Sequence, residues 1–396
     1  MTAAAPKQMH LAAHFPGADG TTVRTDPFRG RTDFSSFEHL ARTAERGLFD
    51  FLLLADGPWP GGPDGPVPGQ DVAGRPESLT MLAALAGVTE RLGLAATADA
   101  TFNEPYELAR RLATLDHLSA GRAAWNVVSS RDALAGENFR RGAGPDGAGL
   151  LRGPGFTRTG GTPFTRAAEF VATARELWDS WTPDGVPRPF AHHGRHFSVG
   201  GEFTVPRSPQ GHPVVIQSAD SRRGRESAAA AADIVLTRLG TPDAARSFYA
   251  DVKGRLAKYG REPDELKVMP GVHVVLGDSD AEARERADAI RPGGIPPQHA
   301  APARGGGLPA RRTLIGATGR QPLAGSPPAV AARLAEYVAA GAADGFVLVP
   351  HPAIGGLDEF IDRVVPLLQE RGVFRCAYTG STLRSHLGLA EPVWKG

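Results

Sequence analysis

The stretch Leu115–Ser130, LDHLSAGRAAWNVVSS, decides the fold of this chain of 396 residues. We expect a helix to end just before Gly121, because glycine readily takes the left-handed conformation that closes a helix C-terminus. The apolar run Ala123–Val128 that follows is typical of a strand. That strand contains Asn126, whose buried amide must find hydrogen-bond partners or destabilise the protein. Since two serines follow the strand, we expect Asn126 to face something bound there.

This unit of helix, turn and apolar strand recurs along the chain. The expected strands are Met9–Ala13, Phe51–Leu54, Leu92–Ala96, Ala123–Val128, Val214–Ser218, Ile234–Thr237, Val268–Leu276 and Phe346–Val349. The expected helices lie around Phe34–Arg46, Pro76–Thr89, Tyr106–Leu118, Ala167–Trp181, Arg222–Ala232, Pro242–Tyr259, Asp280–Ile290 and Ala329–Ala340. This alternation indicates an α/β protein with parallel strands and helical crossovers. The number of units favours a closed (β/α)8 TIM barrel over an open doubly wound sheet, which usually has fewer strands.

Two insertions interrupt what we interpret as a single domain, residues 1–396. Residues 131–165, after the fourth strand, are rich in Gly and Arg and too long for an ordinary loop, so we expect a partly ordered cover. Residues 291–312, before the last strand, are dominated by Gly, Pro, Ala and Arg, and we expect a mobile lid segment. Residues 356–396 are a C-terminal extension, in which Tyr378–Gly388 is a candidate contact between copies of a homodimer or homotetramer.

Composition excludes several classes of protein. Lys and Arg number 44 against 43 for Asp and Glu, which argues against a nucleic acid or an anionic membrane as the main partner. Cys376 is the one cysteine, so neither an intramolecular disulfide nor a cysteine zinc site can form. The N-terminus does not resemble a secretory signal, and no apolar run approaches the length of a membrane span. We therefore expect a cytoplasmic protein.

Two motifs in the sequence point to no function of their own, and two common catalytic motifs are absent. Gly142–Gly147 matches the dinucleotide fingerprint in letters, but no strand precedes it and no helix follows it. His192–His196, HHGRH, has metal-ligating residue types without a helical face or an adjacent carboxylate, so we expect a solvated hairpin and no metal site. Walker A loops and G-x-S-x-G elbows are absent from the sequence, which argues against the simplest NTPase and α/β-hydrolase interpretations.

Polar or aromatic residues follow most of the expected strands. In a barrel these C-terminal strand ends meet at one face, which is where barrel enzymes place their chemistry. Any one such residue is more often an ordinary cap or turn. His14 and His351 are candidates by placement only, and a surface histidine is the favoured alternative for each. Ser221 is placed to begin a helix, where backbone N–H groups could bind a phosphate. Asp220 would repel a phosphate, so we expect it to point away or to pair with Arg222 or Arg223.

Several stretches together resemble a known family. Leu115–Arg122 with Trp125–Ser130 resembles the strand-four signature of the nitrilotriacetate and dibenzothiophene-sulfone monooxygenase group, within the bacterial-luciferase-like superfamily of flavin-dependent monooxygenases. Further agreement is found in Phe49–Asp56, Glu104–Arg110, Ala168–Phe170, Leu177–Trp181, His193–Phe197, Pro206–Gly211, Ala343–Phe346, Val365–Phe374 and Tyr378–Gly388. The resemblance spans nearly the whole chain.

The resemblance implies a cofactor and a reaction. Members of the group use reduced FMN, supplied by a separate NAD(P)H:flavin reductase, and dioxygen to oxygenate a small organic substrate through a flavin peroxide. By position, the residues implied to surround the flavin ring and ribityl chain are Asp56, Thr97, Asn126, Ser129 and Ser130, of which Asn126 and Ser130 are the candidate catalytic residues. Ser218 and Ser221 would lie near the phosphate.

The sequence also departs from the group in ways that leave alternatives open. Some relatives carry a histidine where Ser130 stands, and many carry a tyrosine where Phe164 stands, so the substrate and any acid or base stay undetermined. The alternatives are a hydride-transfer oxidoreductase of the same superfamily, using a deazaflavin or a flavin, and a protein that binds FMN without turnover.

Overall fold

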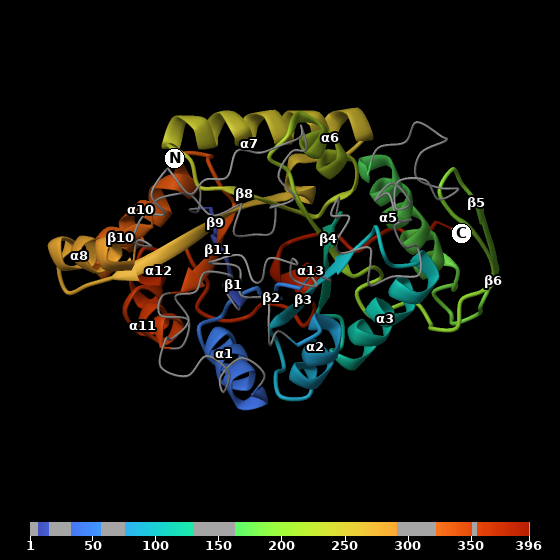
Figure 1. Ribbon diagram of the computed structural model, residues 1–396, viewed down its shortest axis with the longest axis horizontal. Helices are drawn as coiled ribbons and strands as arrows, with labels where there is room; N and C mark the ends of the chain where they lie inside the picture. Colours follow the sequence, from blue (N-terminus) through green and yellow to red (C-terminus); the bar gives the residue numbers. More distant parts are fainter. Residues whose placement is uncertain are drawn as a thin grey trace, which may run out of the picture.

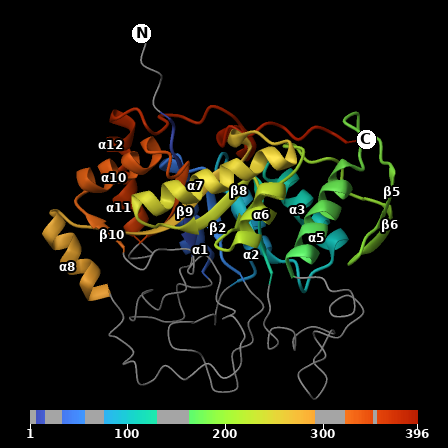
Figure 2. The ribbon, with the colours of Figure 1, turned by 90° about the horizontal axis from the view of Figure 1, so that it is seen from above.

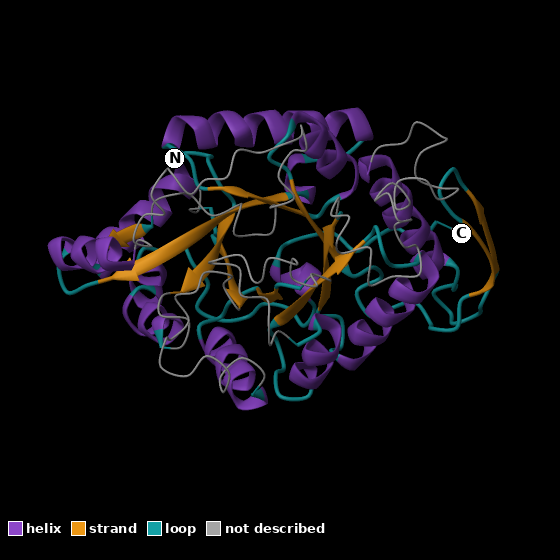
Figure 3. Ribbon diagram, in the orientation of Figure 1, coloured by secondary structure: helices purple, strands orange, loops and turns teal. Residues whose placement is uncertain are grey.

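The computed structural model describes residues 7–15, 33–56, 76–129, 163–290, 322–350 and 355–395. Within these residues the chain alternates strands and helices around one barrel, with the strands forming an inner ring and the helices an outer layer (Figures 1 and 3). No helix in the described ranges is long and apolar enough to cross a membrane. The insertions predicted at 131–165 and 291–312 lie outside the described residues, except for 163–165.

Parallel pairing closes the barrel. The strands that form the ring are β1 (His10–Phe15), β2 (Phe51–Leu54), β3 (Gly93–Asp99), β4 (Ala123–Val128), β7 (Val214–Ser218), β8 (Ile234–Arg238), β9 (Lys267–Leu276) and β11 (Gly345–Pro350). Each pairs with the next, and β11 pairs with β1 to complete the circle. The predicted (β/α)8 TIM barrel is therefore confirmed. The first and third strands extend further than expected, so His14 and Thr97 lie within strands rather than after them.

Helices cover the outside of the ring in the predicted order. They are α1 (Phe34–Arg46), α2 (Ser78–Ala86), α3 (Pro105–Leu118), α5 (Pro163–Asp179), α6 (Arg222–Ala231), α7 (Pro242–Leu256), α8 (Asp280–Ile290) and α10 (Pro327–Ala339). Three helices that were not predicted follow β11: α11 (Gly356–Arg363), α12 (Val365–Glu370) and α13 (Leu383–His386). Two 3-10 turns, Ala257–Tyr259 and Pro263–Glu265, follow α7. The hairpin expected around His192–His196 is formed by β5 (Pro189–His193) and β6 (Ser198–Glu202). A short strand that was not predicted, β10 (Leu323–Gly325), lies beside β9.

Alternation along each strand separates two cores. Every second residue of the strands faces inward, and a barrel-interior cluster includes Ala12, Phe51, Ala95, Ile216 and Met269. The intervening residues face outward and join a larger cluster between the strands and the helices. This alternation determines which side chains can reach a molecule bound inside the mouth of the barrel.

The turn in the opening stretch is tighter than its sequence predicts. Ala120 (φ 54°) and Gly121 (φ 88°) are both left-handed, whereas only the glycine was expected to be. The Gly121 N–H donates to the carbonyl of Asp116, and the Asp116 carboxylate accepts from the N–H of Ala123 at 2.9 Å. Burial raises the pKa of Asp116, while the Ala123 N–H and Gln210 stabilise its ionised form. These hydrogen bonds hold the tight turn that connects α3 to β4.

Buried aspartates fasten the N-terminal end of the barrel. Asp50, Asp233 and Asp344 each precede a strand, and each forms two bonds with one residue of the neighbouring strand: its N–H donates to that residue's carbonyl, and its carboxylate accepts from that residue's N–H at 2.8 Å. The partner residues are Leu11, Val215 and Val268. Because the N-terminal face of a barrel serves stability and the chemistry lies at the opposite face, we assign these aspartates a structural role.

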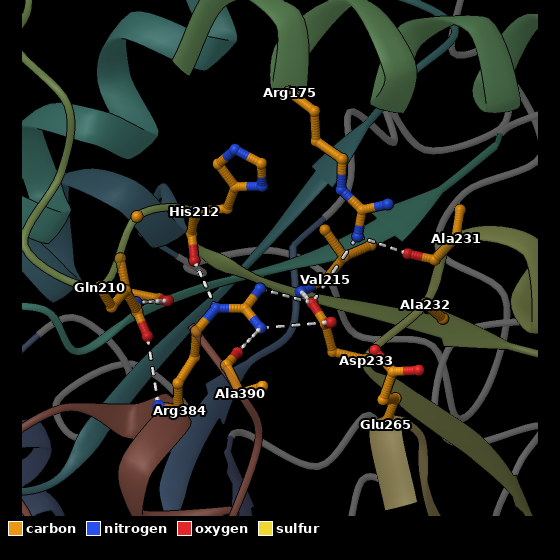
Figure 4. A network of polar contacts seen from close by, with 12 residues as sticks. Arg175, Gln210, His212, Val215, Ala231, Ala232, Asp233, Glu265, Arg384 and Ala390 are labelled. Atoms are coloured by element: carbon orange, nitrogen blue, oxygen red, sulfur yellow. Dashed lines mark hydrogen bonds and ion pairs between the residues drawn. The ribbon is translucent and has the colours of Figure 1, made fainter. Parts of the chain in front are cut away.

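The C-terminal segment, residues 371–395, seals that same end (Figure 2). Leu383, Leu387 and Leu389 join the barrel-interior cluster, so α13 fills the N-terminal opening. Arg384 is buried, pairs with Asp233 at 3.1 Å, and donates to the carbonyl of His212 at 2.9 Å (Figure 4). The candidate oligomer run Tyr378–Gly388 therefore buries two of its leucines in its own barrel, and any contact between copies must use its other residues.

Candidate active site

Polar side chains gather at the C-terminal ends of β2, β3 and β4. Asp56 follows β2, while Thr97 of β3 and Asn126 of β4 face inward and are paired in register. Thr97 and Asn126 are each 5% exposed, so neither is an ordinary surface residue. Three of the sequence-predicted site residues are thus brought to one side of the barrel mouth.

Hydrogen bonds join these residues into one network through Ser78, a residue that the sequence interpretation missed. The N–H of Ser78 donates to the carboxylate of Asp56 at 3.0 Å. Its hydroxyl donates to the carbonyl of Thr97 at 3.0 Å, and the Asn126 amide donates to the Thr97 hydroxyl at 3.1 Å. Ser78 is the first residue of α2. The only feature of the sequence that could have pointed to Ser78 is that a polar residue stands near the start of a predicted helix.

Only one end of the Asn126 side-chain amide has a hydrogen-bond partner among the described residues. Its Nδ2 has the Thr97 hydroxyl, but its Oδ1 is buried and has no hydrogen-bond partner among the described residues. A buried amide oxygen without a donor costs about 1–3 kcal/mol. The unpaired oxygen lies on the inward face of β4, where a bound molecule with an N–H or O–H group would satisfy it.

The turn between β7 and α6 forms a second polar group of residues. Ser221 is the N-cap of α6, and its hydroxyl accepts from the N–H of Gly224 at 3.0 Å, as predicted. A Cβ at Gly224 would lie 3.2 Å from that hydroxyl and 3.3 Å from the Cα of Ala219, so glycine lets the helix start close to the strand. Ser218, the last residue of β7, is exposed beside this helix start.

Of the two arrangements expected for Asp220, pointing away or pairing with Arg222 or Arg223, the pairing was wrong. Asp220 lies 3.6 Å from Arg238, the last residue of β8, instead of pairing with Arg222 or Arg223. Because β7 and β8 are adjacent, their C-terminal ends bring these two groups together. The pairing offsets the negative charge of Asp220 beside the helix N-terminus.

The remaining predicted site residues fall in three groups. Ser129 is exposed directly after β4, next to the strand that carries Ser218. Ser130 and His351 lie outside the described residues. His14 is 1% exposed on β1, so the surface alternative is wrong for that residue.

The HHGRH motif forms the predicted hairpin but is less solvated than expected. His192 is largely buried, with its imidazole 2.9 Å from Glu176 and 3.4 Å from Glu169. Glu169 also accepts from the N–H groups of His196 and Phe197, which anchors the β5–β6 hairpin to α5. No group of metal-ligating side chains occurs in the described part of the chain.

The residues present fit an FMN molecule. The open Asn126 oxygen can accept from a ring N–H, and the helix start at Ser221 can receive a phosphate through backbone N–H groups and the helix dipole. Both lie at the C-terminal end of the barrel: Asn126 is on β4, and the helix start follows β7, the neighbouring strand. Polar groups at this face are typical of the class of barrel enzymes that use a cofactor.

Known proteins agree with this class. Residues 9–344 match the family model of luciferase-like monooxygenases. The chain is 36% identical to component A of nitrilotriacetate monooxygenase from Aminobacter aminovorans, over 91% of each chain. It is 33% identical to dibenzothiophene-sulfone monooxygenase from Rhodococcus erythropolis (strain XP), over 98% of each. The solved EDTA monooxygenase from Chelativorans sp. BNC1 superposes with a TM-score of 0.79 at 26% identity, covering 98% of this chain and 100% of that one.

The chain belongs to the luciferase-like monooxygenase family. The family and the flavin-dependent monooxygenase activity inferred from the sequence are thereby confirmed.

Proposed function

We propose that this protein is the oxygenating component of a two-component system that uses reduced FMN and dioxygen. The observation that carries the proposal is the buried Asn126 amide, whose oxygen lacks a donor at the mouth of the barrel. A structural asparagine would have both ends of its amide paired. The family adds the flavin and the oxygen chemistry, and a separate NAD(P)H:flavin reductase supplies the reduced cofactor.

The chain's own residues bind and orient the cofactor. Asn126 would hold the flavin ring, and Thr97 and Asp56 would fix Asn126 through the Ser78 network. Ser129 and Ser130 would face the ribityl chain, while Ser218 and Ser221 would hold the phosphate at the start of α6. When bound, FMN supplies the reactivity toward oxygen, and the protein supplies orientation and a pocket that excludes water.

Binding and turnover test this proposal separately. Reduced FMN is titrated into the protein under anaerobic conditions, and binding with 1:1 stoichiometry is expected. Air, NADH and a flavin reductase are then added with nitrilotriacetate, EDTA and dibenzothiophene sulfone, the compounds in the names of the relatives. An oxygenated or cleaved product identified by mass spectrometry, with one oxygen atom from ¹⁸O₂, is the expected result.

Other outcomes would redirect the assignment. Failure to bind reduced FMN would overturn the proposal. Tight binding of a reduced deazaflavin, with substrate reduction in the absence of oxygen, would indicate the hydride-transfer alternative. The third alternative is a protein that binds FMN without turnover. It would be favoured if reduced FMN binds but is oxidised no faster than free reduced FMN in the presence of every compound tested.

A further inference from the structure

An arginine lies at the mouth of the barrel beside the start of α6. Arg238 is the last residue of β8, two residues after Leu236, whose side chain belongs to the barrel-interior cluster. Because strand side chains alternate with period two, Arg238 is on the inward face of β8. Ser218, the last residue of β7, is paired in register with Leu236. Two further steps along both chains bring Asp220 beside Arg238, which explains the ion pair between them.

The guanidinium of Arg238 is open to a ligand. Its side chain is 52% exposed, and its one partner among the described residues is Asp220. The distance from Nε of Arg238 to Oδ2 of Asp220 is 3.6 Å, which is longer than a hydrogen bond. The ion pair therefore leaves the five N–H donors of the guanidinium without an acceptor among the described residues.

The charge of the turn between β7 and α6 depends on this arginine. A phosphate monoester carries a charge of about −1.5 to −2 at neutral pH, whereas a helix N-terminus offers only about half a positive charge. Asp220 directly precedes the N-cap Ser221, and its full negative charge exceeds the positive charge of the helix end. Arg222 and Arg223 are exposed in the first turn of α6, whereas Arg238 lies on a strand face directed into the barrel mouth.

The neighbouring strand gives independent evidence that the mouth holds a polar ligand. Asn126 of β4 is 5% exposed, and its Oδ1 has no hydrogen-bond partner among the described residues. β4 pairs with β7, and β7 pairs with β8, so Asn126 and Arg238 stand on either side of the strand that leads into α6. A ligand that satisfies the Asn126 oxygen at one end can therefore place an anionic group between Ser218 and Arg238.

We propose that Arg238 binds the phosphate of FMN across from the start of α6 and thereby selects the phosphorylated cofactor. The inference rests on the proposed function for the presence of the flavin, and it adds a binding residue and a specificity. A guanidinium presents a planar fork of donors that matches a phosphate, so Arg238 can bind two phosphate oxygens at once. Before a phosphate binds, the same guanidinium offsets the charge of Asp220.

Titration with two flavins tests the assignment. Reduced FMN and reduced riboflavin, which differ only by the phosphate, are titrated anaerobically into the protein by calorimetry. We expect Arg238→Met to weaken FMN binding about 10-fold or more, the range for hydrogen bonds to a charged group, and to leave riboflavin binding within about twofold. Arg238→Lys, which keeps the charge but loses the planar fork, should recover part of the loss.

An Asp220→Asn background separates binding of the phosphate from neutralisation of Asp220. No carboxylate is left to offset in this background, so Arg238→Met should still weaken FMN binding severalfold because it removes a direct contact with the phosphate. If Arg238→Met causes no further loss there, the arginine acts only through Asp220 and the inference is overturned.

Two controls test whether the effect belongs to Arg238. Arg246→Met removes an arginine of similar exposure, 49% against 52%, that pairs with Asp243 at the start of α7, and it should leave the binding of both flavins unchanged. Arg223→Met lowers the positive charge of the α6 turn and should weaken FMN binding less than Arg238→Met does. Equal losses in Arg223→Met and Arg238→Met would assign phosphate binding to the general charge of the turn and overturn the inference.

The remaining outcomes separate this inference from the proposed function. If the wild type binds both flavins and Arg238→Met weakens both equally or neither, the role of Arg238 is overturned and the proposed function stands. If the wild type binds neither flavin, the proposed function fails, and this inference fails with it.

Discussion

Asn126 is the residue at which the fold and the proposed chemistry meet. Replacing it with leucine removes the unpaired amide oxygen along with the bond to Thr97. We expect Asn126→Leu to weaken reduced-FMN binding about 10-fold or more while the melting temperature stays within a few degrees, because a buried unpaired amide contributes little stability. Anaerobic titration and calorimetric melting provide the two measurements.

The matched control for that variant is Thr97→Val. It removes the hydroxyl that orients Asn126 but keeps the amide itself, so its effect on FMN binding should be smaller. Unchanged FMN affinity in Asn126→Leu would assign the asparagine to the structure of the strand alone.

Ser221 provides a second test at the scale of one residue. Ser221→Asp keeps a good N-cap for α6 but places a negative charge beside the proposed phosphate position. We expect the variant to bind FMN at least 10-fold more weakly and to bind riboflavin, which lacks the phosphate, unchanged. Thr241→Asp makes the same replacement at the N-cap of α7 and should affect neither ligand. An equal loss of FMN and riboflavin affinity would place the phosphate elsewhere.

Single residues were predictable where their role is local. Asn126 and Ser221 could be placed from the sequence, because an apolar strand and a helix cap are set by neighbouring residues. The strand that carries Thr97 was predicted to end too early, and Thr97 was indicated only by the family resemblance. The Ser78 network and the Asp220–Arg238 pair could not be placed from the sequence, because each joins segments that only the closed barrel brings together.

At the scale of elements, Gly121 links the opening stretch to the C-terminal segment. A Cβ at this position would lie 2.8 Å from Cγ2 of Thr382, and the Gly121 carbonyl accepts from the N–H of Leu383 at 3.0 Å. Gly121→Ala therefore combines an unfavourable positive φ with a clash against α13. We expect its free energy of unfolding, measured in urea, to fall by about 2–4 kcal/mol.

Gly185→Ala is the matched control. Gly185 has nearly the same φ, 85° against 88°, but no atom lies within 4 Å of its added Cβ. The free energy of unfolding of Gly185→Ala should fall by only about 1 kcal/mol, because the unfavourable positive φ is its only defect. Thr382→Ser, which removes Cγ2, should restore part of the stability of Gly121→Ala. If both alanine variants lose the same free energy of unfolding, the contact between Gly121 and the start of α13 does not contribute to stability.

The strands and helices of the barrel were predictable from hydrophobic period alone, with ends displaced by a few residues. The short strand β10 was missed because three residues carry too little pattern. The role of α13 as a seal was missed because four helical residues show no periodicity, and their leucines acquire meaning only inside the barrel.

At the scale of the whole molecule, the buried aspartates predict sensitivity to acid. Burial opposes the ionisation of Asp50, but Arg375 and His10 outweigh it and lower its pKa to about 2. Burial likewise opposes ionisation of Asp344, while Lys253 and Lys7 lower its pKa to about 2. Both pKa values are below the ordinary 3.8, so their stabilisation is complete above about pH 4 and is lost as pH falls toward 2.

Urea unfolding at a series of pH values tests this prediction. Asp344→Asn should destabilise the protein by about 3 kcal/mol at pH 7, because it leaves buried Lys253 without its charge partner. It should also reduce proton uptake on unfolding between pH 4 and 2 by up to one proton. Glu226→Gln is the control: the Glu226 carboxyl also has a pKa of about 2, lowered by hydrogen bonds from Lys258, Tyr259 and Arg255. Glu226 lies partly exposed at the surface, so its replacement should change the stability little. Parallel pH profiles for wild type and Asp344→Asn would contradict the assignment.

The way the barrel closes also has a consequence during synthesis. β1 pairs with β11, Asp50 forms an ion pair with Arg375, and the Gly121 carbonyl accepts from the Leu383 N–H. Segments that are synthesised early therefore have partners that are synthesised late. At ordinary translation rates that interval is on the order of tens of seconds. Throughout it, the nascent chain carries an open edge on β1 and an unsealed apolar lumen, both of which favour aggregation. The ring can close only after β11 and α13 have been synthesised, and chaperone supply is expected to limit the yield of folded protein.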